Sequence, residues 1–218
     1  MSRIDFAARR QAMVAQQIEA RGITDPRVLA AMREVPREDF VSPGWREEAY
    51  HDGPLPIEAE QTISQPYIVA LMCEALMLQG DERVLEIGTG SGYAAAVLAR
   101  LAAEVHSVEC IAELAELATK RLASHHCSNV AVHAGDGSLG WPNAAPYDAI
   151  VVTAAGPDLP AALKAQLKIG GRLVMPVGER HGAQELLRLT RTGEHDEQRE
   201  VLLPVRFVPL TGAQGWPG

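Results

Sequence analysis

The residues LEIGTGSGY at 85–93 are the strongest indication of the fold of this chain. A short apolar run, RVLEI at 83–87, leads into three glycines that alternate with small polar residues. Closely spaced glycines allow a tight turn, and they let backbone N–H groups approach a ligand without obstruction by Cβ atoms. A buried strand that ends in such a loop and is followed by a helix is typical of a nucleotide-binding βα unit.

The spacing of the glycines distinguishes this loop from the dinucleotide fingerprint. That fingerprint requires G-x-G-x-x-G, whereas Gly88, Gly90 and Gly92 follow G-x-G-x-G, and Tyr93 stands where the last dinucleotide glycine would be. An acidic residue just before the glycines, here Glu86, is typical of sites for S-adenosylmethionine (SAM), a sulfonium cofactor without a phosphate. We therefore predict a SAM site made by Glu86 and the three glycines.

From this loop onward, strand and helix patterns alternate. Short apolar runs predict seven strands, at 83–87, 104–109, 129–136, 147–155, 170–178, 184–191 and 200–210. Helices are expected over 91–103, 111–124 and 158–168, and a polar turn between the last two strands. Repeated βα units imply a parallel sheet covered on both faces, with its most apolar strand, 147–155, at the centre. We therefore predict a doubly wound, mostly parallel seven-stranded α/β fold of the Rossmann-like type, with an antiparallel strand pair at its C-terminal end.

The N-terminal residues show helical rather than alternating patterns. Apolar residues at helical spacing predict a helix over 3–21 that stops at Gly22. A second helix is expected within 24–36, with Thr24 as its cap and Pro36 at its end.

A proline-rich stretch connects these helices to the core. Residues 41–60 hold three prolines and few periodic apolar residues, which indicates a loop, and residues 66–78 have the pattern of a helix. We expect residues 1–80 to form a helical extension and substrate loop that packs on a cofactor-binding core of residues 81–218. The two parts should make a single compact unit.

The composition restricts the classes of partner and compartment. The net charge is −8, which disfavours the clustered cationic surface that nucleic-acid binding requires. Three cysteines without a CxxC pair do not make a disulfide framework and point to a reducing compartment. No stretch approaches the roughly 18 apolar residues of a membrane span, and no signal peptide is recognisable. We expect a soluble, cytoplasmic monomer that binds neither nucleic acid nor membrane.

Two acidic residues follow later strands at the edge where the glycine-rich loop lies. Glu109 ends the second strand, about 20 residues past the loop, where a carboxylate can accept hydrogen bonds from ribose hydroxyls. Asp136 follows the third strand in GDG and could accept from an adenine amino group. The alternatives are a solvated strand end for Glu109 and a simple turn residue for Asp136, because Asp-Gly is also a turn signal. The HHC run at 125–127 lacks zinc-ligand spacing, so we predict no metal site.

The segment EQTISQPYIV at 60–69 places two hydroxyls, Thr62 and Ser64, just before a predicted helix. A carboxylate acceptor fits this segment, because it is already ionised at pH 7 and needs no general base. Hydroxyls and the free N–H groups of a helix start could orient it. The alternative is that Ser64 only caps its own helix. Two signatures of base methylation are absent from the sequence. One is the Asn/Asp-Pro-Pro-aromatic motif for amino groups, and the other is a cysteine after a proline for pyrimidine C5.

Several motifs occur together in an order that resembles the protein-L-isoaspartate O-methyltransferase family over nearly the whole chain. They are QTISQPYIVALM (61–72), RVLEIGTGSGY (83–93), SVE (107–109), GDG (135–137), PYDAIVVTAA (146–155), GGRLVMPVG (170–178) and VRFVPL (205–210). Many methyltransferases share the glycine loop. The TIS-x-P segment and the RFVPL tail are more specific.

The resemblance implies methylation, with SAM, of the free α-carboxyl of L-isoaspartyl residues in damaged proteins, which starts repair through a succinimide. By resemblance, Ser64 matches the active-site serine, and Thr62 and Ile63 lie beside cofactor and acceptor. The cofactor contacts would be made by Gly88, Gly90, Glu109, Asp136 and Thr211. The acceptor peptide would be lined by Arg206, Phe207 and Val208.

One departure concerns the loop before QTIS. The family usually has a glycine-rich GxGQTIS, whereas this chain has Glu58 and Glu60. Two acids there would repel an acceptor carboxylate unless they point to solvent. The rival hypotheses are therefore a SAM enzyme for a different carboxylate acceptor, and a SAM-binding protein without catalysis.

Overall fold

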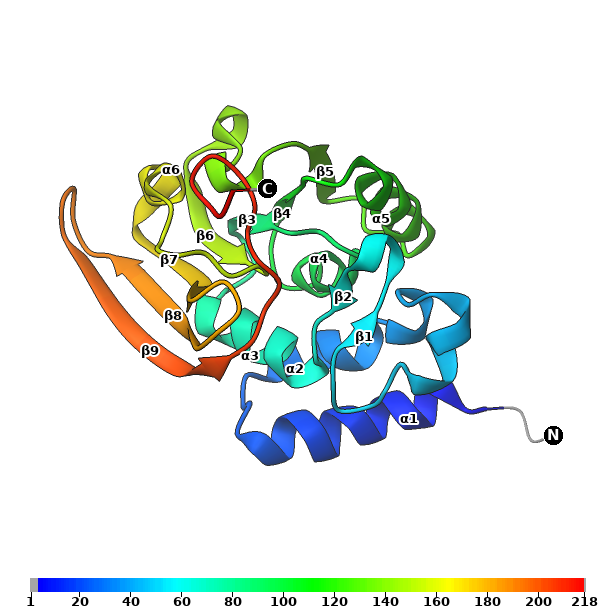
Figure 1. The fold of residues 1–218 in the computed structure, drawn as a ribbon. Coiled ribbons are helices and arrows are strands. Elements are labelled where there is room, and N and C mark those ends of the chain that lie inside the picture. The colour runs from blue at the N-terminus through cyan, green and yellow to red at the C-terminus, as the bar shows by residue number, and fades with distance from the viewer. Residues whose placement is uncertain (1–3, 218) are drawn as a thin grey trace.

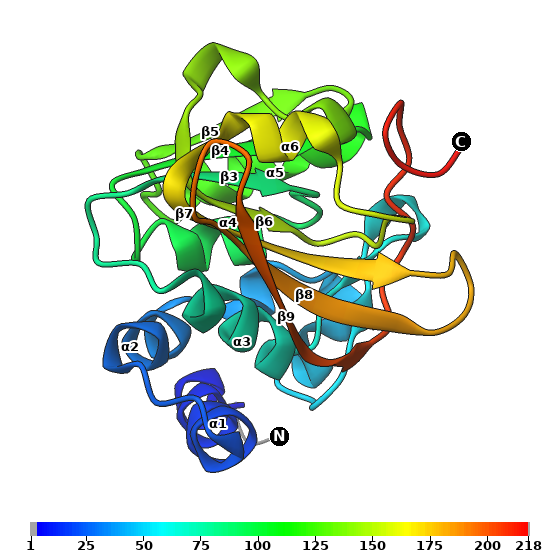
Figure 2. The ribbon, with the colours of Figure 1, turned by 90° about the vertical axis from the view of Figure 1, so that its left-hand side faces the viewer.

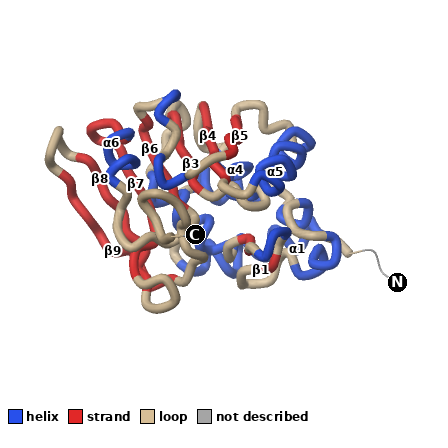
Figure 3. Tube along the Cα trace, turned by 45° about the horizontal axis from the view of Figure 1, so that its top comes forward, coloured by secondary structure: helices blue, strands red, loops and turns tan. Residues whose placement is uncertain are grey.

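The computed structural model describes residues 4–217, which form a seven-stranded sheet between layers of helices (Figure 1). Figure 3 shows the strands side by side in the order β5-β4-β3-β6-β7-β8-β9. The strands are β3 (Arg83–Ile87), β4 (Glu104–Glu109), β5 (Val130–Ala134), β6 (Tyr147–Val152), β7 (Leu167–Gly178), β8 (Gln184–Arg191) and β9 (Glu197–Val205). All pairs are parallel except β7 with β8 and β8 with β9. The predicted seven-stranded sheet with a C-terminal antiparallel pair is confirmed.

The helices divide between the two faces of the sheet. They are α1 (Phe6–Met13), α2 (Pro26–Glu34), α3 (Pro66–Leu76), α4 (Tyr93–Leu98), α5 (Ala112–Ser124) and α6 (Ala161–Gln166). In Figure 2, α6 lies on one side of the sheet, and α3 lies on the other with α2 and α1 beyond it. No helix within residues 4–217 is both long and apolar enough to span a membrane.

Side-chain alternation along the inner strands explains this doubly wound arrangement. On β3, Val84 packs into the apolar cluster under α3, α4 and α5, whereas Leu85 packs into the cluster under α6. On β6, Val151 and Ile150 divide between the same two clusters. Successive residues of a strand point to opposite faces, so strands that are apolar throughout need cover on both. β6 is the middle strand of the seven, as its composition predicts.

The sheet order places a crevice at the carboxyl end of β3. From β3 the chain continues to β4 on one side, whereas β6 joins β3 on the other. The connecting segments therefore leave in opposite directions at this point, and a crevice opens between them. The glycine-rich loop follows β3 directly and lies at this switch point.

The N-terminal extension contains both predicted helices, and the cap of the second differs from the prediction. The helix predicted over 3–21 begins at Arg3, outside the described residues. From Phe6 it runs as α1, a π-helical turn and a 3₁₀ turn to Gly22, whose φ is 98°. Thr24 as the cap of α2 is wrong, because the Asp25 carboxylate accepts from the N–H groups of Arg27 and Val28. Asp and Ser lead Thr as N-cap residues, and Asp25 directly precedes Pro26 at the first helical position.

The end of the last strand is also corrected. The strand predicted to reach residue 210 stops at Val205, and Arg206–Leu210 leave the sheet edge. This segment crosses back to the end of β6, where Ala155 N donates to Val208 O at 2.8 Å and Leu210 N to Ala155 O at 2.8 Å. Pro209 has no N–H to give to a ladder, so it fits a crossing segment better than a strand. The segment thereby reaches the crevice at the carboxyl end of β3.

Candidate active site

Two adjoining cavities open at the carboxyl edge of the sheet. The first, of about 380 Å³, lies over the glycine-rich loop and the end of β4. The second, of about 780 Å³, lies between α3 and the segment after β9. Both volumes fall within the roughly 300–1,000 Å³ that is usual for ligand sites. The residues that line both are Thr62, Ser64, Thr153, Val208 and Pro209, so the two cavities join there.

The three loop glycines all have left-handed backbone conformations, with φ of 93° at Gly88, 53° at Gly90 and 89° at Gly92. A Cβ at Gly88 would overlap with Thr153 Oγ1, whereas at Gly90 its nearest neighbour would be Ile57 Cδ1 at 3.6 Å. Gly90 therefore leaves room for a ligand. Gly92 lines neither cavity and faces Ala118 of α5, so its small size serves the packing of α5 against the loop.

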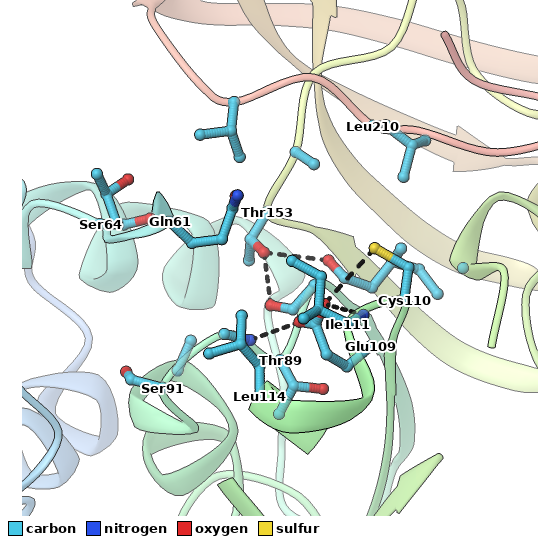
Figure 4. A pocket seen from close by; sticks show the side chains of 18 of the residues that line it. Gln61, Ser64, Thr89, Ser91, Glu109, Cys110, Ile111, Leu114, Thr153 and Leu210 are labelled. Carbon is cyan, nitrogen blue, oxygen red and sulfur yellow. Dashed lines mark hydrogen bonds between the residues drawn. The ribbon is translucent and has the colours of Figure 1, made fainter. Parts of the chain in front are cut away.

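Glu109 is fixed at the rim of the first cavity, at the end of β4. Its side chain is buried, and Oε2 accepts from Gly90 N at 2.8 Å while Oε1 accepts from Ile111 N at 3.0 Å (Figure 4). These bonds hold the carboxylate against the glycine-rich loop, where it lines the cavity. A carboxylate has about four acceptor positions, so each oxygen can accept a further hydrogen bond from a ligand hydroxyl.

Glu86 is buried beneath the loop and does not line either cavity. Its Oε2 accepts from Ser107 Oγ at 2.5 Å, and Oε1 is buried without a hydrogen-bond partner in the described chain. Burial raises the pKa of Glu86 to about 8 against the opposing effect of the Ser107 bond, and the charge of Glu109 adds to the rise. The side chain is therefore mostly protonated at pH 7 and supports the loop from below as a neutral group.

The walls of the first cavity suit a nucleoside. Its lining includes Glu109 and several aliphatic residues, among them Ile87, Val108, Ile111 and Leu114. An apolar slot next to a fixed carboxylate matches a flat base joined to a sugar diol, and Gly90 permits close backbone approach. The volume of the cavity, its apolar walls and its acceptor carboxylate together fit SAM. Among the described residues, no cationic side chain lines the cavity that would bind a phosphate.

The structure places Asp136 differently from the expectation of a direct base contact. Its Oδ1 accepts from Ser138 N at 2.9 Å and Ser138 Oγ at 2.7 Å, and its Oδ2 accepts from Ala213 N at 2.8 Å. Asp136 does not line the first cavity, although Gly137 and Thr211 do. The carboxylate thus fastens the C-terminal segment next to the cavity. Its contact with an adenine amino group stays a prediction.

The acceptor-side residues sit where β2 (Thr62–Ile63) runs into α3. Ser64 is half-buried, lies at the junction of the two cavities and is labelled on one side of Figure 4, with Leu210 and Cys110 on the other. The N-cap residue of α3 is Gln65, and no side chain caps this helix. The interpretation of Ser64 as a helix cap is therefore wrong, and Ser64 lines both cavities without that task.

The predicted peptide-lining residues do reach the second cavity. Arg206, Phe207 and Val208 all line it, and Phe207 N donates to Gln184 Oε1 at 2.7 Å. The structure thus brings together these residues, Thr62, Ser64, Glu109 and Thr211 at one edge of the sheet.

Thr153 lines both cavities, although no sequence motif marks it as a site residue. Its Oγ1 donates to Gly88 O at 2.7 Å and lies 3.1 Å from Ile87 O, which joins the end of β6 to the glycine-rich loop. Its place near the site could be predicted from the sequence, because Thr153 directly follows the central strand at the carboxyl edge of the sheet. Gln61 and Cys110 also line the first cavity, but nothing local in the sequence marks them.

The two acids of the loop before QTIS lie in different surroundings. The Glu58 carboxylate pairs with Arg121 of α5 at 2.8 Å, accepts from Ser42 Oγ at 3.2 Å and lines neither cavity. Glu60 lines the first cavity, and its φ of 57° is left-handed. The family usually has glycine at this position, and a non-glycine residue there costs roughly 1–2 kcal/mol. The Glu58–Arg121 pair helps to hold that loop conformation.

We expect Glu58→Gln to lower the free energy of unfolding by about 0.5–1 kcal/mol at pH 7, the usual value of a partly exposed ion pair. Burial alone would raise the pKa of Glu58, but hydrogen bonds from its own backbone and from Arg121 outweigh this and lower it. The stabilisation is therefore present above the ordinary carboxyl pKa and is lost as the pH falls through the lowered value. Urea melts of both proteins at pH 7 and pH 3 measure this; equal differences at the two pH values would contradict it.

Comparison with known proteins gives a consistent family. The family model described as protein-L-isoaspartate(D-aspartate) O-methyltransferase matches residues 8–215. The chain is 65% identical over 204 residues to a protein-L-isoaspartate O-methyltransferase of Rhodopseudomonas palustris, with 94% of each chain covered. It is 56% identical over 200 residues to one of Myxococcus xanthus, covering 91% of this chain and 94% of the relative.

Solved structures agree with these relatives. A protein-L-isoaspartate O-methyltransferase superposes with a TM-score of 0.83 at 31% identity, covering 94% of this chain and 67% of that chain. A Plasmodium falciparum protein of the same description, solved in complex with S-adenosyl-L-homocysteine, has a TM-score of 0.80 at 24% identity and covers 93% of this chain and 98% of its own. The second likeness supports the fold.

Proposed function

The chain belongs to the protein-L-isoaspartate O-methyltransferase family, and we propose how its two joined cavities carry out that reaction. The protein is a SAM-dependent enzyme that methylates the free α-carboxyl of L-isoaspartyl residues in damaged proteins. The ester then closes to a succinimide, which starts repair. The observation that supports the assignment of sites is the junction at Thr62, Ser64 and Thr153, where a cofactor-sized cavity meets a larger one that is open to a peptide.

In the first cavity, we assign each cofactor contact to a group that lines or shapes it. Bound SAM supplies an electrophilic methyl group on a positively charged sulfur. Glu109 would accept from the ribose hydroxyls, and Gly88 and Gly90 would let the backbone approach. Ile63, Ser64 and Thr211 line the cavity and would contact the cofactor directly. Glu86, Gly92 and Asp136 would act indirectly, by supporting the loop, the packing of α5 and the C-terminal segment.

At the junction, Thr62 and Ser64 would orient the acceptor carboxylate. This group is ionised at neutral pH and attacks as it is, so the protein needs to align it and to exclude water rather than to remove a proton. The hydroxyls can donate to one carboxylate oxygen and leave the other free to attack. Arg206, Phe207 and Val208 would hold the peptide on both sides of the isoaspartate, because they line the second cavity.

We also assign tasks to the two parts of the chain. Residues 1–80 would form the acceptor-side extension, since they carry Thr62 and Ser64, and residues 81–218 would form the cofactor-binding core. We propose a cytoplasmic monomer without nucleic-acid partners. The net charge of −8 and the three free cysteines support this setting.

The test is methyl transfer from labelled SAM to two peptides that differ only in isoaspartate or aspartate at one position. Labelling of the isoaspartyl peptide alone, as a base-labile ester, is the expected result. If both peptides stayed unlabelled while SAM bound, a different carboxylate acceptor or a purely SAM-binding role would replace the proposal. A screen of other carboxylates would then decide between these two.

We expect Glu109→Ala to weaken SAM binding by about 30-fold, because a charged acceptor for ligand hydroxyls is worth roughly 2 kcal/mol. The substitution also removes the bond from Gly90 N, which loosens the loop. Titration calorimetry with SAM measures the effect. Glu113→Ala, at the exposed start of α5, is the matched control and should bind normally. Unaltered SAM affinity in Glu109→Ala would refute the ribose contact.

A further inference from the structure

The second cavity has an unusual charge for this protein. Its lining holds three arginines and a histidine, Arg21, Arg180, Arg206 and His181, and no aspartate or glutamate. The chain as a whole carries 28 acidic and only 20 basic side chains, so an excess of cations at one cavity runs against its average composition. The acceptor cavity therefore has its own electrostatic preference, opposite in sign to that of the net charge.

Only some of these cations are free to bind a ligand. Arg21 pairs with Asp52 at 3.3 Å, and its guanidinium lies 3.7 Å from the centre of the Tyr67 ring. Arg180 and Arg206 form no ion pair within residues 4–217, and Arg180 Nε is buried without a hydrogen-bond partner. A buried guanidinium N–H without an acceptor is costly, which indicates that a ligand or water completes it.

A buried glutamine holds the two arginine-bearing segments together. Arg180 lies in the turn between β7 and β8, and Arg206 follows β9. Gln184 Nε2 donates to Glu179 O at 3.1 Å, and Gln184 Oε1 accepts from Phe207 N at 2.7 Å. The side chain of Gln184 is only 3% exposed. The neighbours of both arginines are thus fixed to one buried anchor, and the pair is a built feature of the cavity wall.

Two free guanidinium groups exceed what the reacting carboxylate needs. That group meets Thr62 and Ser64 at the junction, and a bidentate arginine on it would stabilise the anion and weaken it as a nucleophile. We propose that Arg180 and Arg206 bind carboxylates of residues that flank the isoaspartate, so that the enzyme prefers acidic segments of damaged proteins. This proposal rests on the proposed function and names the class of acceptor within it.

The test compares isoaspartyl peptides of one length whose flanking residues are glutamate, glutamine or lysine. We expect the glutamate peptide to have about a ten-fold higher kcat/KM than the glutamine peptide, mainly through a lower KM, and the lysine peptide to have the lowest value. This corresponds to about 0.7 kcal/mol for each of two partly exposed pairs. In 0.5 M salt the preference should shrink, because the Debye length falls to roughly 4 Å.

Charge-reversing variants connect the preference to these residues. Arg180→Glu and Arg206→Glu should each level the glutamate and lysine peptides, because one pair then repels while the other still attracts, and the double variant should reverse their order. Arg180→Gln should leave about a three-fold preference for the glutamate over the glutamine peptide, because the pair of Arg206 remains. Lys120→Glu, at an exposed position of α5 that lines neither cavity, makes the same change in net charge and should keep the wild-type order. Thermal melts confirm that each variant is folded.

Three results would overturn the proposal. The wild-type enzyme could use the glutamate and glutamine peptides equally, which needs no variant to establish. The arginine variants could slow all isoaspartyl peptides by one common factor, which would place both arginines on the reacting carboxylate instead. If no isoaspartyl peptide were methylated at all, the proposed function itself would fail, and the subsite with it.

Discussion

Ser64→Ala should lower kcat for methyl transfer to an isoaspartyl peptide by about 100-fold, the usual cost of removing one aligned hydrogen-bond donor from a reaction centre. The SAM dissociation constant should rise by no more than about ten-fold, the effect of one neutral hydrogen bond. We expect the larger effect on kcat because of where Ser64 lies. Ser64 is at the junction of both cavities, and the cap of α3 is Gln65, so its hydroxyl is not used to begin the helix.

Separate measurements of kcat, KM and SAM affinity distinguish this role from a structural one. Ser128→Ala, an exposed serine after α5, makes the same chemical change away from the cavities and should leave all three unchanged. Equal losses of kcat and of thermal stability in Ser64→Ala would indicate a packing role. A wild-type kcat would remove Ser64 from the reaction.

Features with a local cause were predictable from the sequence. The strand–glycine–helix unit at 83–98 follows from apolar run length and backbone freedom, and both are encoded within a few neighbouring residues. The sheet and its central strand follow in the same way from repeated apolar runs. The site edge could also be located, because parallel strands bring all their carboxyl ends to one side. Glu109 is predictable for this reason, whereas Ser64 is predictable from its place just before a predicted helix and from the family resemblance.

Features that depend on distant partners were not predictable. The ion pair of Glu58 joins residues 63 positions apart, so its neutralisation is invisible in the local EAEQTIS pattern. The end of the last strand at Val205 depends on a crossing segment that bonds to Ala155. Arg180 and Arg206 meet through Gln184, and no periodicity marks that meeting. In each case tertiary contacts, rather than local preference, decide the outcome.

Gly88→Ala should weaken SAM binding by about 100-fold. The φ of 93° at Gly88 lies in the left-handed region, where a Cβ costs roughly 1–2 kcal/mol. That Cβ would also overlap with Thr153 Oγ1 and displace its bond to Gly88 O, which adds about 1 kcal/mol. Together these make about 3 kcal/mol, or two decades in affinity if the strain is relieved by opening the loop. Calorimetry with SAM, combined with thermal melts, measures both consequences.

A double-substitution cycle separates backbone strain from the overlap with Thr153. Thr153→Ala removes the atom that the new Cβ would meet, so Gly88→Ala should cost less in that background, by about 1 kcal/mol. Gly44→Ala is the control, since a Cβ there meets nothing within 4 Å. If the cost of Gly88→Ala were the same in both backgrounds, strain in φ alone would explain it. If Gly88→Ala bound SAM normally, the left-handed turn would not be what brings the backbone to the cofactor.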